Sequence, residues 1–592
     1  MKLYCLIALL SLSGAALSNT LVQDWRSDFG PPSASTNQPF QLIGLPDGTT
    51  FHLGRGSIAG LTYPSITKVS PLGLPLASYL YADTPGQFNA ALTDGHGNVY
   101  VCGSIGTGSS RAILVKLDQA TMRPADSWRD DGAGDGVRLY SNGSSNTAQS
   151  IAFAPNGDLV AGISTSLDCC FLRLDPNGDR SNAWADFGDG VGERRFDFGT
   201  SEAVRSVRLD EEGNCYGGLV VDQDMVALKL DSEGSRSDAW PDDGFGQGLR
   251  KYGMTPGQNE VTQGIIVTPE RSVIVFGSSN VAPGNSYGTI LKLARDGSRL
   301  WTFHFDGPAA TDHLNGATLL SDGSVVAASS SGRILKVDGS SGALSPSWQD
   351  TGDGLGVRRL PGTSSGVGVA CDPYDTIYAI GSTTTSCAFL AVTEQGHTAI
   401  SDLISLGTSP ACNGVFIDAQ NRIYLSGNYF DGTRKAVALR YSRYRLSGSV
   451  HLQDWAAATE GVPVTIEMRN TVTGVVMETH TVNLDENGRF RIDTAFLGPC
   501  VLSCQTLHWL RDTSIEPSIP ADGLSVNFDL VNGDCDGDNE VGIGDYAQLS
   551  AAYGSSVGDA NFDPMADLNG DEAVDIADYA ILSSNYGMAG DD

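Results

Sequence analysis

Two stretches near the C-terminus place oxygen donors at alternate positions and close with a carboxylate at position twelve. The donors of the first stretch are Asp534, Asp536, Asp538, the carbonyl of Glu540, and Asp545. Those of the second stretch are Asp567, Asn569, Asp571, the carbonyl of Ala573, Asp575 and Asp578. Hard oxygen donors at this spacing converge on one cation when the backbone wraps around it, and Ca²⁺ prefers such a site. The sequence therefore predicts two calcium ions, one in each loop.

The two loops differ in how completely they match this spacing. Position 9 of the first loop is Gly542, which has no side-chain ligand, so we expect a water molecule there. Position 6, where a turn glycine is usual, is Asn539 in the first loop and Glu572 in the second. Asn tolerates a left-handed backbone, whereas Glu is expected to be strained or differently placed. The second loop has the fuller ligand set and is the firmer prediction.

A short helix is expected after each loop, because Tyr-Ala-x-Leu-Ser follows at 546–550 and again at 579–583. The helices should end near Gly554 and Gly587. Residues 531–592 contain fourteen Asp or Glu and no Lys or Arg. Such a segment repels itself without a cation, which predicts that metal binding is coupled to its folding.

The Asp at position twelve, the repeated helices and the β-rich sequence before the first loop together resemble a dockerin of type I. This resemblance implies that residues 531–592 attach the chain to a cohesin-like protein or a cell-surface component. Positions 10 and 11 are Ile543-Gly544 and Ile576-Ala577. They replace the Ser-Thr pair that contacts cohesin in clostridial dockerins, so the resemblance leaves the partner's identity open.

Residues 19–445 contain a recurring unit of apolar strands separated by Gly, Asp or Asn turns, at intervals of roughly 50 residues. The second strand of the unit is expected at 50–53, 99–103, 159–163, 215–219, 273–277, 325–329, 377–381 and 423–427. The third ends near Lys-Leu-Asp, and the fourth begins with Trp128, Trp184, Trp240 and Trp348 in four of the units. The repeats resemble the delta-sixty class of bacterial β-propellers. They predict a propeller with four strands in each blade.

The first predicted strand, around Trp25, looks like the fourth strand of a unit whose other three strands are missing. The last unit, which ends at Tyr441, has three strands and no fourth. Both observations are explained if the N-terminal strand completes the last blade, beside residues 437–441, and so removes an exposed edge. The sequence therefore predicts eight closed blades, with seven as the alternative.

Residues 446–530 alternate apolar and polar side chains, as at 464–468 and 489–492, which predicts a small β-sandwich. The opening residues 446–450 and the later 488–490 resemble carboxypeptidase-regulatory-like or collagen-adhesin B-type modules, which implies a spacer or adhesion role. The segment contains no lysine, so the lysine–asparagine isopeptide bond of some adhesin modules is excluded.

Residues 1–18 read as a signal peptide, so the mature chain is expected to be secreted and extracellular or at the cell surface. No later apolar stretch is long enough to predict a membrane span. The net charge of −32 argues against a nucleic-acid partner. Ten cysteines remain without Cys5, and those in apolar strands, such as Cys102 and Cys215, are expected to be buried thiols.

No residue is assigned as catalytic or as binding an organic cofactor. The Gly-x-Ser-x-Gly segments at 284–288 and 362–366 lack the α/β context of a nucleophile elbow. The eight histidines show no paired metal-binding spacing. The Asp-rich segments at 130–135 and 350–353 are interpreted as solvated turns.

These observations predict a mainly all-β chain with a propeller at 19–445, a sandwich at 446–530 and a small helical dockerin-like domain at 531–592. The leading hypothesis is a secreted, non-catalytic binding or scaffold protein whose propeller recognises a glycan or a protein. The alternative, suggested by the enzymes that commonly carry dockerins, is a polysaccharide-degrading glycoside hydrolase or lyase with its active site on the propeller. Paired carboxylates for such chemistry cannot be identified from sequence spacing.

Overall fold

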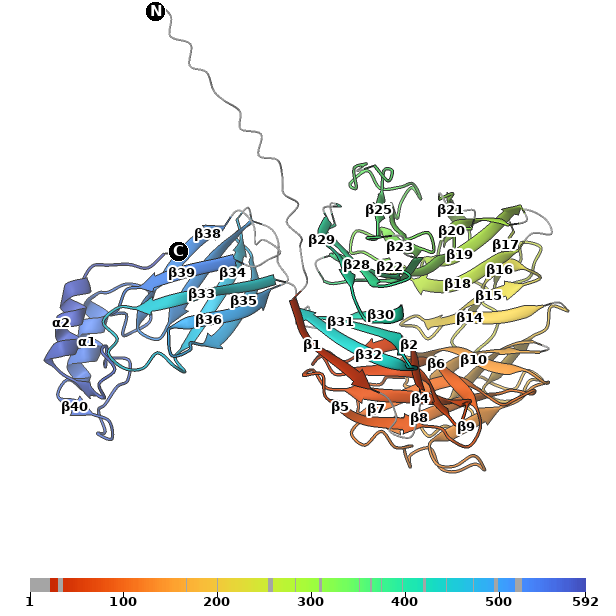
Figure 1. The fold of residues 1–592 in the computed structure, drawn as a ribbon, viewed down its shortest axis with the longest axis horizontal. Coiled ribbons are helices and arrows are strands. Elements are labelled where there is room, and N and C mark those ends of the chain that lie inside the picture. The colour runs from red at the N-terminus through yellow and green to blue at the C-terminus, as the bar shows by residue number, and fades with distance from the viewer. Residues whose placement is uncertain are drawn as a thin grey trace, which may run out of the picture. The chain divides into compact units, whose positions relative to one another are not determined.

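The computed structural model forms two compact units, Met1–Tyr441 and Ser442–Asp592 (Figure 1). It describes residues 22–29 and 36–591, apart from 167, 200, 254–258, 283, 308–310, 351, 363–364, 374, 395, 397, 419–421, 443, 472, 495–498 and 517–523. The predicted signal peptide and the side chain of Trp25 lie outside the described residues.

Within the described residues, the first unit contains eight four-stranded antiparallel sheets. Four of them are β2–β5 (Thr36–Gly44, Thr50–Ile58, Leu61–Val69, Pro75–Leu80), β6–β9 (Gly86–Thr93, Asn98–Ile105, Arg111–Asp118, Val137–Tyr140), β10–β13 (Asn146–Phe153, Leu159–Thr165, Cys169–Leu174, Glu193–Phe196) and β14–β17 (Glu202–Leu209, Cys215–Val221, Asp224–Leu230, Leu249–Tyr252). The others are β18–β21 (Glu260–Val267, Val273–Ala282, Asn285–Leu293, Arg299–Phe305), β22–β25 (Leu314–Leu319, Val325–Ser329, Arg333–Val337, Val357–Arg359), β26–β29 (Ser365–Cys371, Ile377–Ser382, Cys387–Val392, Thr398–Ile404) and β30–β32 (Thr408–Ile417, Ile423–Asp431, Thr433–Ser442) with β1 (Val22–Phe29).

The first strands of successive sheets contact one another in sequence order, and β30 contacts β2, so the contacts return to the first sheet (Figure 1). The hydrophobic cores lie between neighbouring sheets. Phe51 and Ile66 of one sheet, for example, pack in one cluster with Val101 and Ile113 of the next. Strands such as β8 are buried on both faces, which explains their nearly continuous apolar sequence.

The N-terminal strand completes the last sheet, as the sequence predicts. β1 is hydrogen-bonded beside β32, in the order β1-β32-β31-β30 (Figure 1). Its side chains add contacts across the sheet: Arg26 Nη2 donates to the Leu406 carbonyl at 3.0 Å, and Tyr429 Oη donates to Asp28 Oδ2 at 3.1 Å. An edge of β32 that would otherwise be unpaired is thereby covered.

Each of the four repeated tryptophans is fully buried in the loop before the fourth strand of its sheet, rather than at the start of that strand as predicted. An arginine of the fourth strand lies over the indole, and its Nε donates to a glycine carbonyl of the following sheet. The arginine–glycine pairs are Arg138–Gly178, Arg194–Gly234, Arg250–Gly297 and Arg358–Gly396, with distances of 2.7–2.8 Å. The repeated motif therefore connects four of the sheets to the sheet that follows each of them.

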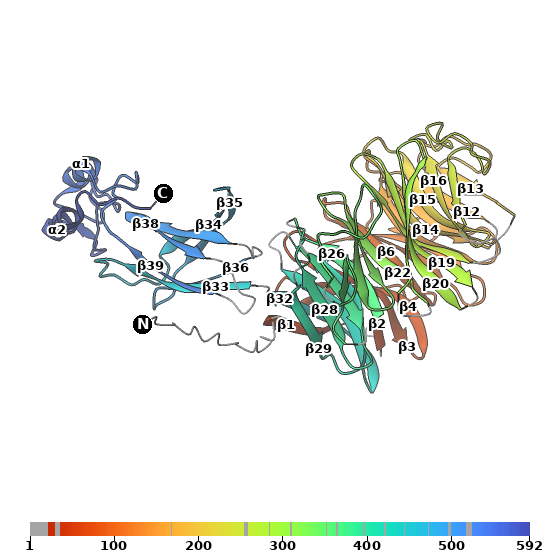
Figure 2. The ribbon, with the colours of Figure 1, turned by 90° about the horizontal axis from the view of Figure 1, so that it is seen from above.

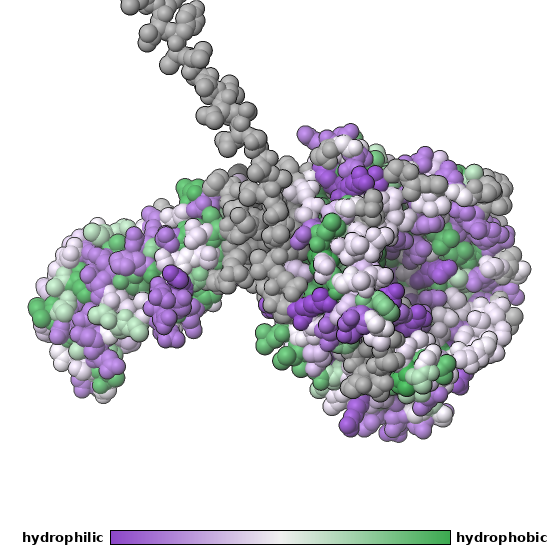
Figure 3. All heavy atoms as spheres, in the orientation of Figure 1, coloured by the Kyte–Doolittle hydropathy of each residue, from purple (hydrophilic) through white to green (hydrophobic). Residues whose placement is uncertain are grey.

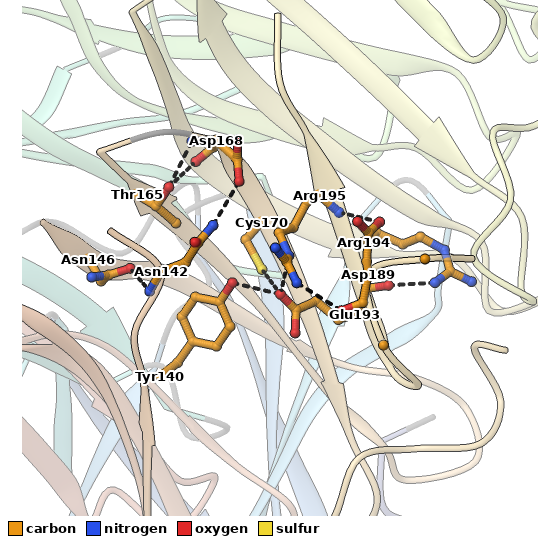
Figure 4. A network of polar contacts seen from close by, with 12 residues as sticks. Tyr140, Asn142, Asn146, Thr165, Asp168, Cys170, Asp189, Glu193, Arg194 and Arg195 are labelled. Carbon is orange, nitrogen blue, oxygen red and sulfur yellow. Dashed lines mark hydrogen bonds and ion pairs between the residues drawn. The ribbon is translucent and has the colours of Figure 1, made fainter. Parts of the chain in front are cut away.

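A buried carboxylate connects two sheets in the same way (Figure 4). Glu193 of β13 accepts hydrogen bonds from Tyr140 Oη of β9 at 2.7 Å, from Arg195 Nε at 2.7 Å and from Arg180 Nη1 at 2.5 Å. Burial raises the pKa of Glu193, but the bonds from Arg180 and Tyr140 outweigh it and keep the pKa below its usual value. With its oxygens paired, this carboxylate has a structural role.

The second unit contains two facing β-sheets and two helices. The sheets are β36-β33-β39 (Arg489–Thr494, Tyr444–Leu452, Leu524–Leu530) and β35-β34-β37-β38 (Val476–Asn483, Pro463–Asn470, Cys500–Thr506, Trp509–Glu516). The helices are α1 (Ile543–Ala552) and α2 (Ile576–Asn585), which lie side by side in Figures 1 and 2, with a short ladder of β40 (Ser555–Ser556) and β41 (Ala573–Val574). Among the described residues, neither helix has the length and apolar character needed to cross a membrane.

The predicted sandwich and the predicted helical domain share one core. Leu510 of β38 belongs to the same buried cluster as Leu549 of α1 and Leu582 of α2. Gly570 lies so close to Trp455 that a β-carbon there would be 2.5 Å from the indole. The structure therefore joins in one compact unit two segments that the sequence suggested were separate.

Candidate metal centre

The first acidic loop brings three of its predicted ligands together. Carboxylate oxygens of Asp534, Asp536 and Asp538 lie within 4.8 Å of one another. Asp534 Oδ2 accepts a bond from Asn539 N at 3.1 Å, whereas Asp534 Oδ1 is buried and has no hydrogen-bond partner within the described structure. A buried, unpaired carboxylate oxygen is costly, and a cation would satisfy it. The donor set therefore fits a hard divalent cation.

Asp545, at position twelve, is held where it can close the first loop. Its Oδ1 accepts a bond from Asp536 N at 3.1 Å, and its Oδ2 accepts one from Gly542 N at 2.6 Å. Asp545 belongs to the first turn of α1, so the start of the helix fixes this carboxylate relative to the loop. Glu540 is exposed, and its amide donates to Asp538 Oδ1 at 2.9 Å.

The second loop is closed in the same way, but its carboxylates are not gathered as closely. Asp578 Oδ1 accepts a bond from Leu568 N at 2.8 Å and its Oδ2 one from Asp575 N at 2.8 Å. Asp567 accepts bonds from the amides of Gly570 and Glu572. The amide of Asp571 donates a hydrogen bond to Asn569 Oδ1, and the amide of Ala573 donates one to Asp571 Oδ1. Asp575 caps α2 by accepting a bond from Ala577 N at 2.7 Å.

Position 6 adopts a left-handed backbone in both loops, with φ of 68° at Asn539 and 70° at Glu572. The prediction that Glu572 is strained therefore holds, because a side chain with a β-carbon pays a cost in this region. The left-handed residue reverses the chain so that the amide at position 6 points back to the first carboxylate. In the second loop this is the bond from Glu572 N to Asp567 Oδ2, at 3.0 Å.

The two loops are related by an internal repeat. β41 of the second loop pairs with β40, directly after α1, and Glu540 of the first loop forms a matching bridge with Ala589, after α2. Equivalent backbone bonds run from Gly587 N to Val541 O and from Gly554 N to Val574 O, both at 2.8 Å. Each loop is thus anchored by the chain that follows the other loop's helix.

The electrostatics of the loops favour a bound cation. Burial raises the pKa of Asp534 to about 6, and the charges of Asp545 and Asp538 act in the same direction. Burial likewise raises the pKa of Asp536, Asp567 and Asp578. Like charges at close range disfavour ionisation, and a divalent cation reverses that effect.

Two buried polar side chains beneath the first loop were not found by sequence reasoning. His508 is buried, neither ring nitrogen has a hydrogen-bond partner within the described structure, and burial lowers its pKa to about 3. Its carbonyl accepts bonds from Gly533 N and Asp534 N, both at 3.0 Å. Asn532 Nδ2 donates to the carbonyls of Gln453 and Leu568 at 3.0 and 2.7 Å. These contacts fix both loops to the sandwich. No spacing of residues in the sequence predicts them.

The helices leave a matched pair of apolar side chains in solvent. Ile543 and Ile576, at position 10 of the two loops, are 78% and 65% exposed. Tyr553 and Tyr586, at the helix C-termini, are also exposed. These exposed apolar side chains therefore occupy equivalent positions beside the two acidic loops.

Residues 363–364 of the Gly-x-Ser-x-Gly segment at 362–366 lie outside the described residues, and the other sequence candidates have structural explanations. Ser286 is buried within β20, and no strand-to-helix turn surrounds it. Asp130 Oδ1 accepts bonds from the amides of Gly132 and Gly134, each at 2.7 Å, and Asp350 does the same with Gly352 and Gly354, so these turns are closed by the backbone.

The structure also places the cysteines. Cys102 and Cys215 are buried free thiols as predicted. Cys387 and Cys412 form a disulfide, a pairing that the sequence left open.

No known family model and no curated protein matches the chain. Similar solved structures include a type II cohesin–X–dockerin complex from Acetivibrio cellulolyticus, in a C-terminal interface mutant. It shows 19% identity over 25% of this chain and 97% of that one, with a TM-score of 0.22. BamB from Moraxella catarrhalis is 13% identical over 71% of this chain and 97% of that one, with a TM-score of 0.42. The WD40 β-propeller domain of Doa1 is 12% identical over 63% and 97%, with a TM-score of 0.37.

Proposed function

We propose that this chain is a secreted modular binding protein, in which a dockerin-like module ordered by two calcium ions attaches a β-propeller to a partner. The observation that carries the proposal is the first acidic loop. Its three gathered carboxylates include a buried oxygen with no partner, which is the expected form of an oxygen-ligand cation site.

Calcium would be held by the side chains and carbonyls that the loop spacing indicates. In the first loop these are Asp534, Asp536, Asp538, Asp545 and the Glu540 carbonyl. In the second loop they are Asp567, Asn569, Asp571, Asp575, Asp578 and the Ala573 carbonyl. The cation would neutralise the loops and order the start of each helix.

The attachment surface of this proposal is the pair of helices. Ile543 and Ile576 occupy equivalent positions and are exposed, so a partner could bury either one with the same geometry. A cohesin-like protein or a cell-surface protein with an apolar groove would fit such a surface. Calcium dependence follows, because the loops position the first turn of both helices.

The binding domain of this proposal is an eight-bladed propeller. Eight four-stranded sheets, contacts that return from β30 to β2, and the N-terminal strand in the last sheet support it. Figure 3 shows hydrophilic residues over much of the visible surface, in keeping with export and with the net charge of −32. The propeller would present a glycan or protein ligand to the site of attachment.

The metal part is tested by calorimetric titration of the full chain, lacking residues 1–18, with Ca²⁺. We expect two bound ions, and one fewer in the Asp545→Asn or Asp578→Asn variant. The matched control is Glu486→Gln, an exposed residue of the β-sandwich whose loss of charge is the same. Unchanged stoichiometry in both loop variants would refute the calcium assignment.

The attachment part is tested by pull-down from the extracellular and cell-surface fractions with calcium or with EDTA. The Ile543→Asp/Ile576→Asp double variant should lose a partner that the parent chain retains with calcium. A partner captured equally in EDTA would contradict the proposed role of the metal. Release of reducing ends from plant or bacterial glycans, abolished by one carboxylate substitution, would instead support the enzyme alternative.

A further inference from the structure

The centre of the first unit contains a cavity of about 770 Å³, lined by the first strands of seven of its sheets. The sheets contribute through β2, β6, β10, β14, β18, β22 and β26. In Figure 1 the first six of these strands surround a common centre. We refer to this cavity as the central channel. Its lining residues are drawn from segments more than 300 residues apart in the sequence, so only the closed ring of sheets creates it.

Each first strand carries a β-bulge at the same place in its sheet. The shift falls between Ala148 and Ser150 in β10 and between Val204 and Ser206 in β14, for example. A bulge inserts one extra residue and redirects its side chain. The extra residues that line the channel are Asn89, Gln149, Arg205, Gln263, Asn315 and Val367, and Asn413 has the same bulge position in β30.

We call these seven bulge residues the carboxamide ring, which consists of five carboxamides, one guanidinium and the apolar Val367. Some of its members retain free hydrogen-bonding capacity. Gln149, Arg205 and Gln263 make no side-chain hydrogen bond in the described structure, and Asn413 Nδ2 is buried without a partner. Asn89 and Asn315 are used differently: their Nδ2 atoms donate to carbonyls of the following sheets at 3.0 and 2.7 Å.

A second arginine lies three residues further along the same strand. Arg208 is surrounded by protein yet open to solvent within the channel, which it helps to line. The only hydrogen bond of its side chain in the described structure runs from Nη1 to the Val207 carbonyl, at 2.8 Å. Burial lowers the pKa of Arg208, and no carboxylate counteracts that effect.

No Asp or Glu is among the described residues that line the channel, although Asp and Glu outnumber Lys and Arg by 69 to 37 in the chain. Two arginines without a carboxylate partner make the channel locally cationic within an acidic protein. A guanidinium and carboxamide N–H groups donate hydrogen bonds and match the oxygens of a carboxylate, sulfate or phosphate.

We propose that the central channel binds a small ligand that carries an oxyanion group, which Arg205 and Arg208 recognise and the carboxamide ring orients. The inference rests on the proposed role of the propeller as the binding domain. It adds the location of the site and the chemical class of its ligand. Carboxamides also hydrogen-bond to hydroxyl groups, so a hydroxylated acid suits the site better than a bare ion.

The test compares glucuronate with glucose by calorimetry on the full chain in calcium-free buffer, after the chelator has been removed by dialysis, because EDTA itself carries carboxylates that would compete for the site. The two probes share most of their hydroxyl groups and differ in the carboxylate. We expect glucuronate to bind at least about tenfold more tightly, and higher salt to weaken it. Equal binding of the two sugars, or no binding of glucuronate, sulfate or phosphate, overturns the proposal. Sulfate or phosphate that binds as tightly as glucuronate supports the oxyanion chemistry and identifies the ligand as a free inorganic anion.

The variants Arg205→Gln and Arg208→Gln should each weaken glucuronate binding by roughly tenfold to a hundredfold. Arg123→Gln, on an exposed turn outside the channel, is the control and should change nothing. Thermal melting shows whether each variant folds. Gln263→Leu removes one carboxamide of the ring without changing the net charge, so it offers a second test. Unchanged glucuronate binding in both channel-arginine variants would contradict the assignment. Because calcium is absent throughout, failure of this test is distinct from failure of the calcium-dependent attachment.

Discussion

Replacing Asp534 by Asn should stabilise the second unit without calcium and destabilise it with calcium. The substitution removes one negative charge from three carboxylates that lie within 4.8 Å of one another. It also places an N–H donor where Asp534 Oδ1 is buried without a partner, beside the acceptors of Asp536 and Asp538. Both changes favour the folded chain when no cation is bound.

The magnitude follows from Coulomb's law. Two like charges 4.8 Å apart repel by about 0.9 kcal/mol in a medium as polar as water, so the loss of two such pairs gains about 1.7 kcal/mol. The unfolded chain retains part of this repulsion, because the three residues are close in sequence. We therefore expect the free energy of unfolding in EDTA to rise by about 1 kcal/mol. With saturating Ca²⁺ it should fall, since a ligand is lost.

The assay is urea unfolding of the second unit within the full chain, followed by circular dichroism in EDTA and in excess Ca²⁺. Glu486→Gln controls for the change in net charge and should leave both curves unchanged. The decisive result is the sign of the effect in EDTA. If Asp534→Asn destabilises the protein equally with and without calcium, Asp534 is a structural hydrogen-bond acceptor and the metal-site reasoning is wrong.

Three further predictions concern the backbone and buried histidine. Glu572→Gly should raise the free energy of unfolding by about 0.5–1 kcal/mol, because φ at this position is 70°. Asn539→Gly, where φ is 68°, should raise it by less, since Asn tolerates a left-handed backbone. A lower free energy of unfolding in the Glu572 variant would contradict the backbone strain. Gly234→Ala should cost about 2–3 kcal/mol in urea unfolding, since its β-carbon would lie 2.7 Å from the Trp184 ring. Gly213→Ala should cost clearly less, because φ there is similar, 82° against 84°, and its β-carbon would lie no closer than 3.5 Å to another side chain. Equal costs would remove the clash from the explanation. Burial lowers the pKa of His52 to about 3 from 6.5, so the unfolded chain takes up the proton at a higher pH than the folded chain does. The contribution of neutral His52 to the free energy of unfolding is therefore complete above pH 6.5 and falls below it, by about 2 kcal/mol at pH 5. In thermal melting, the His52→Gln variant should show a smaller loss of stability between pH 6.5 and pH 5 than the parent chain.

Local sequence patterns predicted the elements of this protein well, because turns, strands and helix starts depend on neighbouring residues. The strands predicted to end in Lys-Leu-Asp correspond, for example, to β8, which ends at Asp118, and to β16, which ends close to Asp231. The helices begin at position 10 of each acidic loop, where Ile543 and Ile576 follow Gly542 and Asp575 at the N-cap. The placement of the N-terminal strand beside β32 was also predictable, since an incomplete repeat at each end leaves matching strands.

The sequence alone thus determined the repeats, the strand order within each repeat and the two acidic loops, all of which depend on local spacing. Only the tertiary structure brought the bulge residues of separate sheets around one channel. Only the tertiary structure placed His508 of the sandwich region beneath the first acidic loop and joined Asn532 to Leu568 of the second. These sites are made of residues tens to hundreds of positions apart, so their proximity depends on ring closure and on packing between segments. No periodicity of side chains along the chain encodes that proximity. The sequence pattern therefore did not distinguish the channel arginines from other arginines in strands.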